Sequence, residues 1–141
     1  MDGGARRFWI CVTAAAIALL ATQNSFAVTR EQKQCEGKED ASPTLRITSC
    51  SAAIEQSQSD KEKSDALINR GKAYDGKGDY TKAITDYTRA IELNGRYANA
   101  YYYRGLTFTQ KGDIDGAKAD FEKVLELNPY DARARKKLED L

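Results

Sequence analysis

Apolar residues recur at helical spacing in two segments of the chain. The first stripe occupies positions i, i+4, i+7 and i+8 and consists of Ala83, Tyr87, Ala90 and Ile91. The second stripe has the same spacing and consists of Ala117, Phe121, Val124 and Leu125. Each pattern is typical of an amphipathic helix that buries one side. We therefore expect helices in both segments.

Start and stop signals surround these stripes. Gly78-Asp79 and Gly112-Asp113 precede them, and we expect the glycine in a turn and the aspartate as the N-cap of the following helix. Upstream, the capping box Ser59-x-x-Glu62 predicts a helix from about 60 to 77. Pro129 follows the last stripe as a stop signal. The sequence thus predicts pairs of helices joined by short turns.

The helix pair occurs twice. Residues 64–97 align with residues 98–131 at a shift of 34, and 11 of the 34 positions are identical, including Arg70/Arg104, Gly71/Gly105 and Asp86/Asp120. Self-similarity at this period indicates a solenoid of stacked units rather than a globular core.

The repeat resembles the tetratricopeptide repeat (TPR) family. The matching positions of the first copy are Leu67, Arg70-Gly71, Tyr74, Gly78, Ala83, Tyr87 and Ala90. Those of the second copy are Tyr101, Arg104-Gly105, Phe108, Gly112, Ala117, Phe121, Val124 and Pro129. The resemblance implies an all-α fold, a short solenoid of antiparallel helix pairs. Arg70 and Arg104 stand where the family usually has leucine, and we expect them to pack their stems and expose the guanidinium.

Flanking segments are expected to cap the two units, 64–97 and 98–131. Residues 28–63 read as an N-terminal cap, a degenerate half-repeat in which Cys50 takes the aromatic position and Cys35 lies on a remnant of the preceding helix. Residues 132–141 read as a C-terminal capping helix with a small apolar face, made of Ala134, Leu138 and Leu141.

The first 27 residues have the pattern of a secretory signal peptide. A short segment with Arg6 and Arg7 precedes the apolar run 8–21, and Ser25-Phe26-Ala27 provides a small-residue cleavage site. We expect export to the periplasm or the extracellular space, as in the small exported TPR proteins of Gram-negative bacteria that the chain resembles. The alternative is an uncleaved inner-membrane anchor that leaves the repeats facing the periplasm, and only then would the protein contact a membrane.

Cleavage would leave two of the three cysteines. Cys35 and Cys50 in an exported chain read first as a disulfide, because the destination is oxidising. Two unpaired thiols, or a reactive site, are the alternatives.

Charge and composition exclude several function classes. The chain has 22 Lys+Arg against 21 Asp+Glu, which lacks the basic excess of a nucleic-acid binder. It contains no histidine, which excludes Ser-His-Asp and Cys-His catalysis, and two cysteines alone cannot hold zinc. No phosphate loop or dinucleotide fingerprint is present. We therefore expect no enzyme, no catalytic residue, no metal and no cofactor.

The resemblance implies a concave groove that binds a protein or peptide partner without turnover, so that the protein acts as an adaptor or assembly helper. The family's groove positions correspond here to Ile68, Lys72, Asp75, Asn99, Tyr102, Tyr103, Leu106, Arg133 and Lys137. Aromatic residues with a basic rim suit a peptide with an apolar side chain and an acidic group. The carboxylate clamp that some members use for heat-shock chaperones is absent, since Ile68, Lys72 and Tyr103 replace its first three residues.

Two other functions stay open at this point. The repeats could self-associate through an end face and serve a structural role, and the sequence leaves the oligomeric state undetermined. Alternatively, Tyr102 and Tyr103 could frame a pocket for a small molecule or glycan.

Overall fold

The computed structural model describes residues 30–37 and 41–141, so the predicted signal peptide at 1–27 lies outside the described residues. The helices within this part of the chain are α2 (Pro43–Gln56), α3 (Asp60–Gly76), α4 (Tyr80–Leu93), α5 (Ala98–Lys111), α6 (Ile114–Leu127) and α7 (Ala132–Glu139). Residues 30–35 form a further short helical segment before α2. The described residues contain no strand, which confirms the predicted all-α fold.

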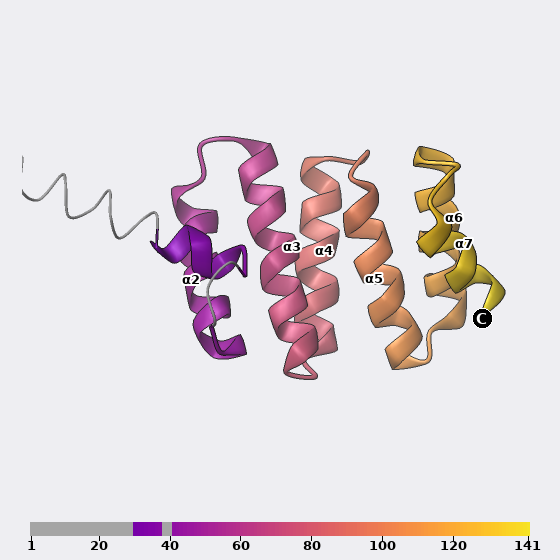
Figure 1. Cartoon of the computed structure of the whole chain (residues 1–141), viewed down its shortest axis with the longest axis horizontal. Coiled ribbons are helices and arrows are strands. Elements are labelled where there is room, and N and C mark those ends of the chain that lie inside the picture. Colours follow the sequence, from indigo (N-terminus) through magenta and orange to yellow (C-terminus); the bar gives the residue numbers. More distant parts are fainter. Residues whose placement is uncertain (1–29, 38–40) are drawn as a thin grey trace, which may run out of the picture.

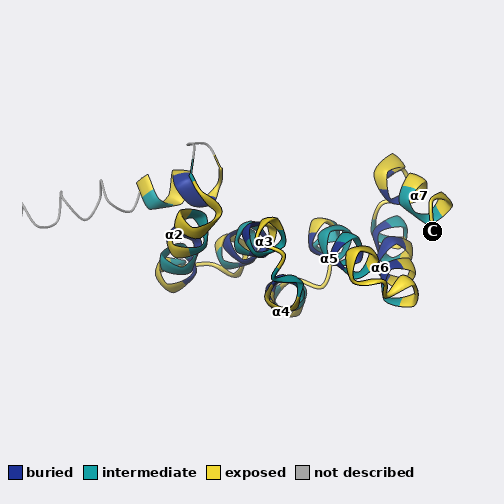
Figure 2. Cartoon of the chain, turned by 90° about the horizontal axis from the view of Figure 1, so that it is seen from below, coloured by how far each residue is buried: buried dark blue, intermediate teal, exposed yellow. Residues whose placement is uncertain are grey.

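The helices stack side by side in chain order (Figure 1). α3 packs on α4 and α5 packs on α6, and these two hairpins are here called the first and the second unit. α2 covers the free side of the first unit, while α7 covers the free side of the second. α3 and α5 also contact each other, on the side of the array away from α4 (Figure 2).

The N-cap residues predicted from the sequence stand at the starts of the helices. The Ser59 hydroxyl accepts from the Glu62 amide at 3.2 Å, and the Asp79 carboxylate accepts from the Lys82 amide at 3.3 Å. Gly78 and Gly112 precede the capping aspartates with φ of 76° and 81°, a conformation that favours glycine. The turn chemistry of both units is therefore as the sequence predicts.

Each unit is locked by an aromatic ring against a glycine. Tyr87 and Phe121 are fully buried, and a Cβ atom on Gly71 would lie 2.6 Å from the Tyr87 ring. A Cβ atom on Gly105 would lie 2.9 Å from the Phe121 ring. These glycines let the two helices of each hairpin approach closely enough for the ring to fill the space between them.

The expectation that Arg70 and Arg104 expose their guanidinium groups is wrong. Their side chains are only 16% and 18% exposed, because each forms a two-point ion pair with an aspartate of the following helix. Arg70 donates to both Asp86 oxygens at 2.7 and 2.8 Å, and Arg104 donates to both Asp120 oxygens at 2.8 Å. These hydrogen bonds raise the pKa of both arginines.

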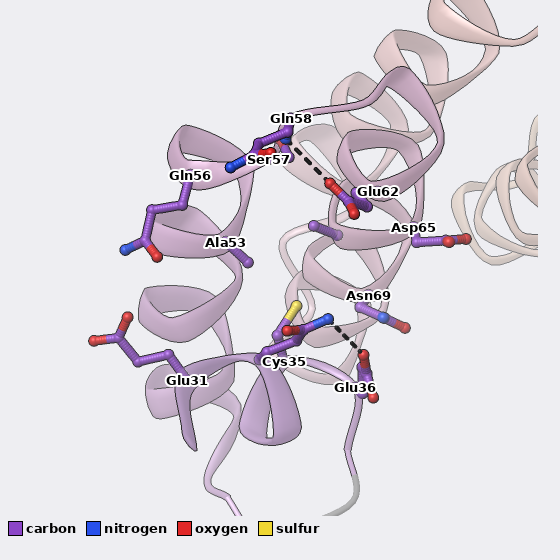
Figure 3. A pocket seen from close by; sticks show the side chains of 12 residues that line it. Glu31, Cys35, Glu36, Ala53, Gln56, Ser57, Gln58, Glu62, Asp65 and Asn69 are labelled. Carbon is purple, nitrogen blue, oxygen red and sulfur yellow. Dashed lines mark hydrogen bonds between the residues drawn. The ribbon is translucent and has the colours of Figure 1, made fainter. Parts of the chain in front are cut away.

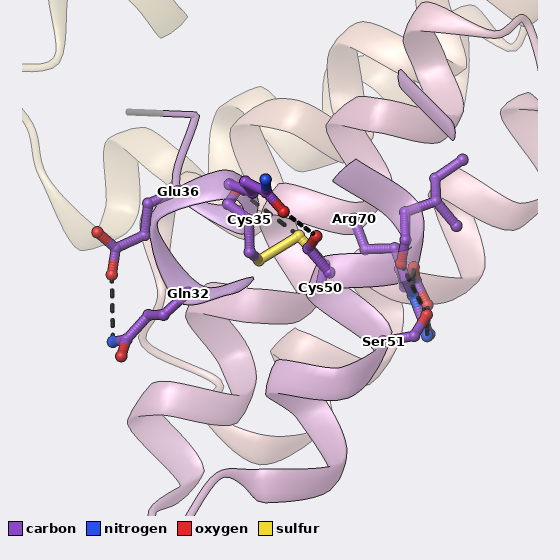
Figure 4. Close-up of a disulfide and its surroundings, with 10 residues drawn as sticks. Gln32, Cys35, Glu36, Cys50, Ser51 and Arg70 are labelled. Atoms are coloured by element: carbon purple, nitrogen blue, oxygen red, sulfur yellow. Dashed lines mark hydrogen bonds and ion pairs between the residues drawn. A yellow bond between two sulfur atoms is a disulfide. The ribbon is translucent and has the colours of Figure 1, made fainter. Parts of the chain in front are cut away.

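The N-terminal half-repeat is closed by a disulfide between Cys35 and Cys50, whose Cα atoms are 4.7 Å apart (Figure 4). Of the alternatives that the sequence left open, the structure contains the disulfide. Next to it, the buried Ser49 hydroxyl donates to the Gln34 side chain at 3.0 Å. This neutral contact between the 30–35 segment and α2 stands where the complete units have an arginine–aspartate pair.

α7 caps the other end. The Asp131 side chain accepts from the amides of Arg133 and Ala134, and Ala134 is fully buried against the second unit. Leu138 is partly buried in the same cluster, but Leu141 is 41% exposed, so its predicted place on the apolar face is wrong. None of the helices in the described part of the chain is long and apolar enough to cross a membrane.

Candidate functional site

The surface formed by α3, α5 and α7 is here called the inner face. Residues that lie one repeat apart occupy equivalent positions on these helices, as Asp65, Asn99 and Arg133 do. Along this row the side chain changes from an acid on α3 through an amide on α5 to a base on α7. This row, Asp65, Asn99 and Arg133, is therefore polarised in charge.

Two tyrosines and two cations form a ladder across the inner face. The Lys72 Nζ lies 4.9 Å from the centre of the Tyr103 ring, and the Arg133 Cζ lies 4.6 Å from the centre of the Tyr102 ring. The two rings meet edge to face with centres 5.7 Å apart. Cation–π attraction and ring packing thus link α3, α5 and α7 in one continuous row.

Buried rings behind the ladder hold it in place. Tyr103 stacks on Tyr87 with centres 6.1 Å apart, and Tyr102 lies 5.8 Å from Phe121. Both Tyr102 and Tyr103 stay partly exposed, although adjacent helical side chains diverge by about 100°. Each ring therefore has one side in the core and another available at the surface.

Arg133 is fixed by more than its ring contact. It donates to both Asp131 oxygens, at 2.8 and 3.2 Å, and its Nη2 lies 3.4 Å from the Asn99 side-chain oxygen. The hydrogen bonds from Arg133 lower the pKa of Asp131. Because half of the Arg133 side chain is still exposed, the cation is both oriented and accessible.

Asp75 has a different environment. Its carboxylate accepts hydrogen bonds from the Tyr87 hydroxyl at 2.7 Å and from the Thr107 hydroxyl at 3.0 Å. Burial raises the pKa of Asp75. Burial, together with the hydrogen bond that the Tyr87 hydroxyl donates to Asp75, raises the pKa of Tyr87. The carboxylate therefore ties the first unit to α5.

Of the remaining residues predicted to bind a partner, some lie in the core and others lie at the surface. Ile68 is only 6% exposed and belongs to the first core cluster, while Leu106 packs on the second. Lys72 and Asn99 are exposed, and Lys137 is half-buried one turn beyond Arg133. No cluster of potential metal ligands occurs among the described residues.

Comparison with known proteins agrees with this architecture. A sequence model of the tetratricopeptide repeat matches residues 68–136. The second TPR domain of human RPAP3, solved in complex with the HSP70 peptide SGPTIEEVD, is 32% identical to the chain with a TM-score of 0.63. That match covers 70% of this chain and 79% of the RPAP3 domain. The chain belongs to the tetratricopeptide repeat family.

Other TPR domains match over more of the chain. The second TPR of Spaghetti (RPAP3), bound to the HSP90 peptide SRMEEVD, is 30% identical with a TM-score of 0.63, over 77% of this chain and 98% of that one. The first TPR of Spaghetti, bound to the same peptide, is 25% identical with a TM-score of 0.67, over 84% and 90%. No curated protein matches the chain.

The structure adds residues that the sequence did not single out for the TPR inner face. Thr107 is almost fully buried and binds Asp75, and the Tyr97 hydroxyl donates to Asp65. No motif marks either contact, because each joins residues 32 positions apart, from α3 to α5 or to the N-cap of α5. Only the assembled array brings them together.

Proposed function

We propose that this TPR protein is a non-catalytic interaction module that binds an extended peptide of a partner protein on its inner face. The observation that carries the proposal is the ladder of Lys72, Tyr103, Tyr102 and Arg133, in which two accessible cations flank two half-exposed rings. Rigid aromatic side chains provide contact area at low cost in conformational entropy, as peptide-binding surfaces need.

The ladder defines the chemistry of the peptide. An apolar side chain would pack on the exposed parts of Tyr102 and Tyr103, while a carboxylate would accept from Arg133 or Lys72. Arg133 needs little reorganisation, because Asp131 and Asn99 already orient its guanidinium. The peptide complexes of the RPAP3 domains support peptide binding by this fold.

We further propose that the protein works as an adaptor or assembly helper after export to the periplasm or the extracellular space. The signal-peptide pattern of residues 1–27 and the Cys35–Cys50 disulfide both favour an oxidising compartment. Intact-mass measurement of the exported protein under non-reducing conditions tests this. We expect a chain that begins at Val28 and is two hydrogens lighter than its reduced form, whereas a retained Met1 would indicate a membrane-tethered protein.

Selection from a displayed random peptide library tests the binding proposal. We expect enrichment of peptides that combine an apolar residue with an acidic one. Affinity for a selected peptide should fall roughly 3- to 10-fold in Lys72→Gln and in Arg133→Gln, since each removes one exposed charge contact. Arg89→Gln, which removes an exposed cation from α4, is the matched control and should bind as the wild type does. If Lys72→Gln and Arg133→Gln bind the selected peptide as tightly as Arg89→Gln and the wild type do, the proposal is contradicted.

A further inference from the structure

A pocket of about 360 Å³ lies at the N-terminal end of the inner face, where segment 31–36 meets α2 and α3 (Figure 3). Its α3 wall includes Asp65 and Asn69, which are one repeat before Asn99 and Tyr103 of α5. The pocket and the ladder are therefore parts of one surface, since both use the same positions of successive helices.

The base of the pocket is apolar and rigid. Ala53 of α2, Ala66 of α3 and Cys35 line it, and Cys35 is held by its disulfide to Cys50. Ala66 and Cys35 are buried, so the base is part of the first core cluster. An aliphatic stem that enters the pocket would meet carbon and sulfur atoms of a fixed wall.

The rim of the pocket is acidic. Glu31 and Glu36 lie on one side, and Glu62 and Asp65 lie on the other. Lysine and arginine are both absent from the described residues that line it. Outside the lining, Lys61 bonds to Asp65 at 2.9 Å from an exposed position, with a side-chain exposure of 80%. The described lining itself contributes four carboxylates and no cation.

An apolar base below a carboxylate rim matches a long side chain with a cationic head. The methylenes of lysine or arginine pack on apolar surface while the charged group stays at the rim. The side-chain amide oxygens of Gln56, Gln58 and Asn69 provide further hydrogen-bond acceptors for a guanidinium or ammonium group. An acidic side chain would instead be repelled.

We propose that this pocket receives a lysine or arginine side chain of the partner peptide whose apolar and acidic residues occupy the ladder. The inference rests on the proposed function, which it deepens by fixing the direction of the peptide. The basic residue lies in the pocket beside Asp65 of α3 and the acidic group lies at Arg133 of α7, so the charges of the peptide oppose those of the row Asp65, Asn99 and Arg133. A peptide of reversed polarity would place like charges together at both ends.

A small cationic probe tests the pocket by itself. We would titrate the full chain with Nα-acetyl-arginine N-methylamide and follow backbone amide shifts by NMR, with the norleucine analogue as the neutral probe. Shifts are expected around Glu31, Ala53 and Glu62 with the arginine probe, and at least fivefold weaker binding in the variant Glu31→Gln/Glu62→Gln. Glu55→Gln, an exposed change on α2 outside the pocket, should bind the probe as the wild type does. Equal binding of both probes, or no shifts at these residues, would overturn the proposal.

Peptide selection separates this inference from the proposed function. If both are right, peptides selected on the wild type carry a basic residue on one fixed side of the acidic one. Selection on Glu31→Gln/Glu62→Gln then loses the basic residue and keeps the apolar and acidic ones. Acidic peptides without a basic preference on the wild type would reject the pocket alone. If no peptide is enriched, the proposed function fails, whereas the arginine probe still decides whether the pocket binds a cation.

Discussion

Arg104 binds Asp120 through two parallel hydrogen bonds and reaches Thr88 of the preceding unit with its third nitrogen, at 3.0 Å. Arg70 makes the same set of contacts one repeat earlier, with Asp86 and with Ser51 of α2 at 2.9 Å. Each arginine therefore joins three helices, namely its own, the next and the previous one. These hydrogen bonds and ion pairs hold neighbouring helices together in an array whose apolar clusters are small.

We expect Arg104→Leu to lower the free energy of unfolding by about 3–5 kcal/mol, because it leaves Asp120 buried without a partner. The double variant Arg104→Leu/Asp120→Leu should recover most of that loss, since it removes both charges. Urea denaturation measures both effects. Lys123→Gln is the control, because it breaks a solvent-screened surface pair with Glu126 and should leave the urea midpoint almost unchanged. A small effect of Arg104→Leu alone would contradict the role of this pair.

Gly71 must stay without a side chain. A Cβ atom there would lie 2.6 Å from the Tyr87 ring, so we expect Gly71→Ala to destabilise the protein by about 1–3 kcal/mol through overpacking. Gly76→Ala is the matched control on the same helix, because no atom lies within 4 Å of its Cβ position. That change should raise stability by about 0.4–1 kcal/mol. Thermal denaturation of both variants would show shifts of Tm in opposite directions.

Reduction of the disulfide should act mainly on the N-terminal half-repeat. The chain-entropy model gives about 3 kcal/mol for a loop that spans 15 residues. We expect Cys35→Ser/Cys50→Ser to speed amide hydrogen exchange in segment 30–37 and in α2, while α5 and α6 keep their protection. Uniform acceleration along the chain would show instead that the half-repeat and the two units unfold as one.

The raised pKa of Asp75 gives stability a defined dependence on pH. Because burial raises this pKa above its ordinary value of 3.8, the folded protein keeps the Asp75 proton to higher pH than the unfolded chain does. The contribution of Asp75 to stability therefore falls as pH rises from about 4 through the folded pKa. The difference in unfolding free energy between wild type and Asp75→Asn should decline over this window and level off above it. A difference that grows with pH would have the wrong sign.

Most of the fold follows from local signals that the sequence displays. The stripe around Tyr87, the capping residues Ser59, Asp79 and Asp113, and the 34-residue period identify helices, turns and units before any coordinates are known. The apolar stripe and the caps are reliable signals because each depends on residues within about two turns of a helix, and the period shows that the same signals occur twice. The two cysteines were also paired correctly, from the expected compartment rather than from geometry.

The side-chain contacts between helices could not be derived in the same way. Arg70 and Asp86 were both visible as repeated residues, yet the family pattern favoured an exposed guanidinium at this position. The orientation of Asp75 toward Tyr87 and Thr107 depends on how α5 docks on the first unit. The pocket beside Cys35 likewise exists only after the half-repeat has folded onto α3.

The two ends of the array lack the ion pair that both complete units possess. Gln34 and Ser49 replace it at one end, and Leu138, one period after Arg104, stands alone at the other. A copy of residues 64–97 inserted between the existing units would bring its own arginine, its own aspartate and a hydroxyl that accepts a hydrogen bond from the next arginine. Lengthening the array by internal duplication would thus leave the contacts of both end segments unchanged. A longer protein that evolved in this way could keep the same two ends.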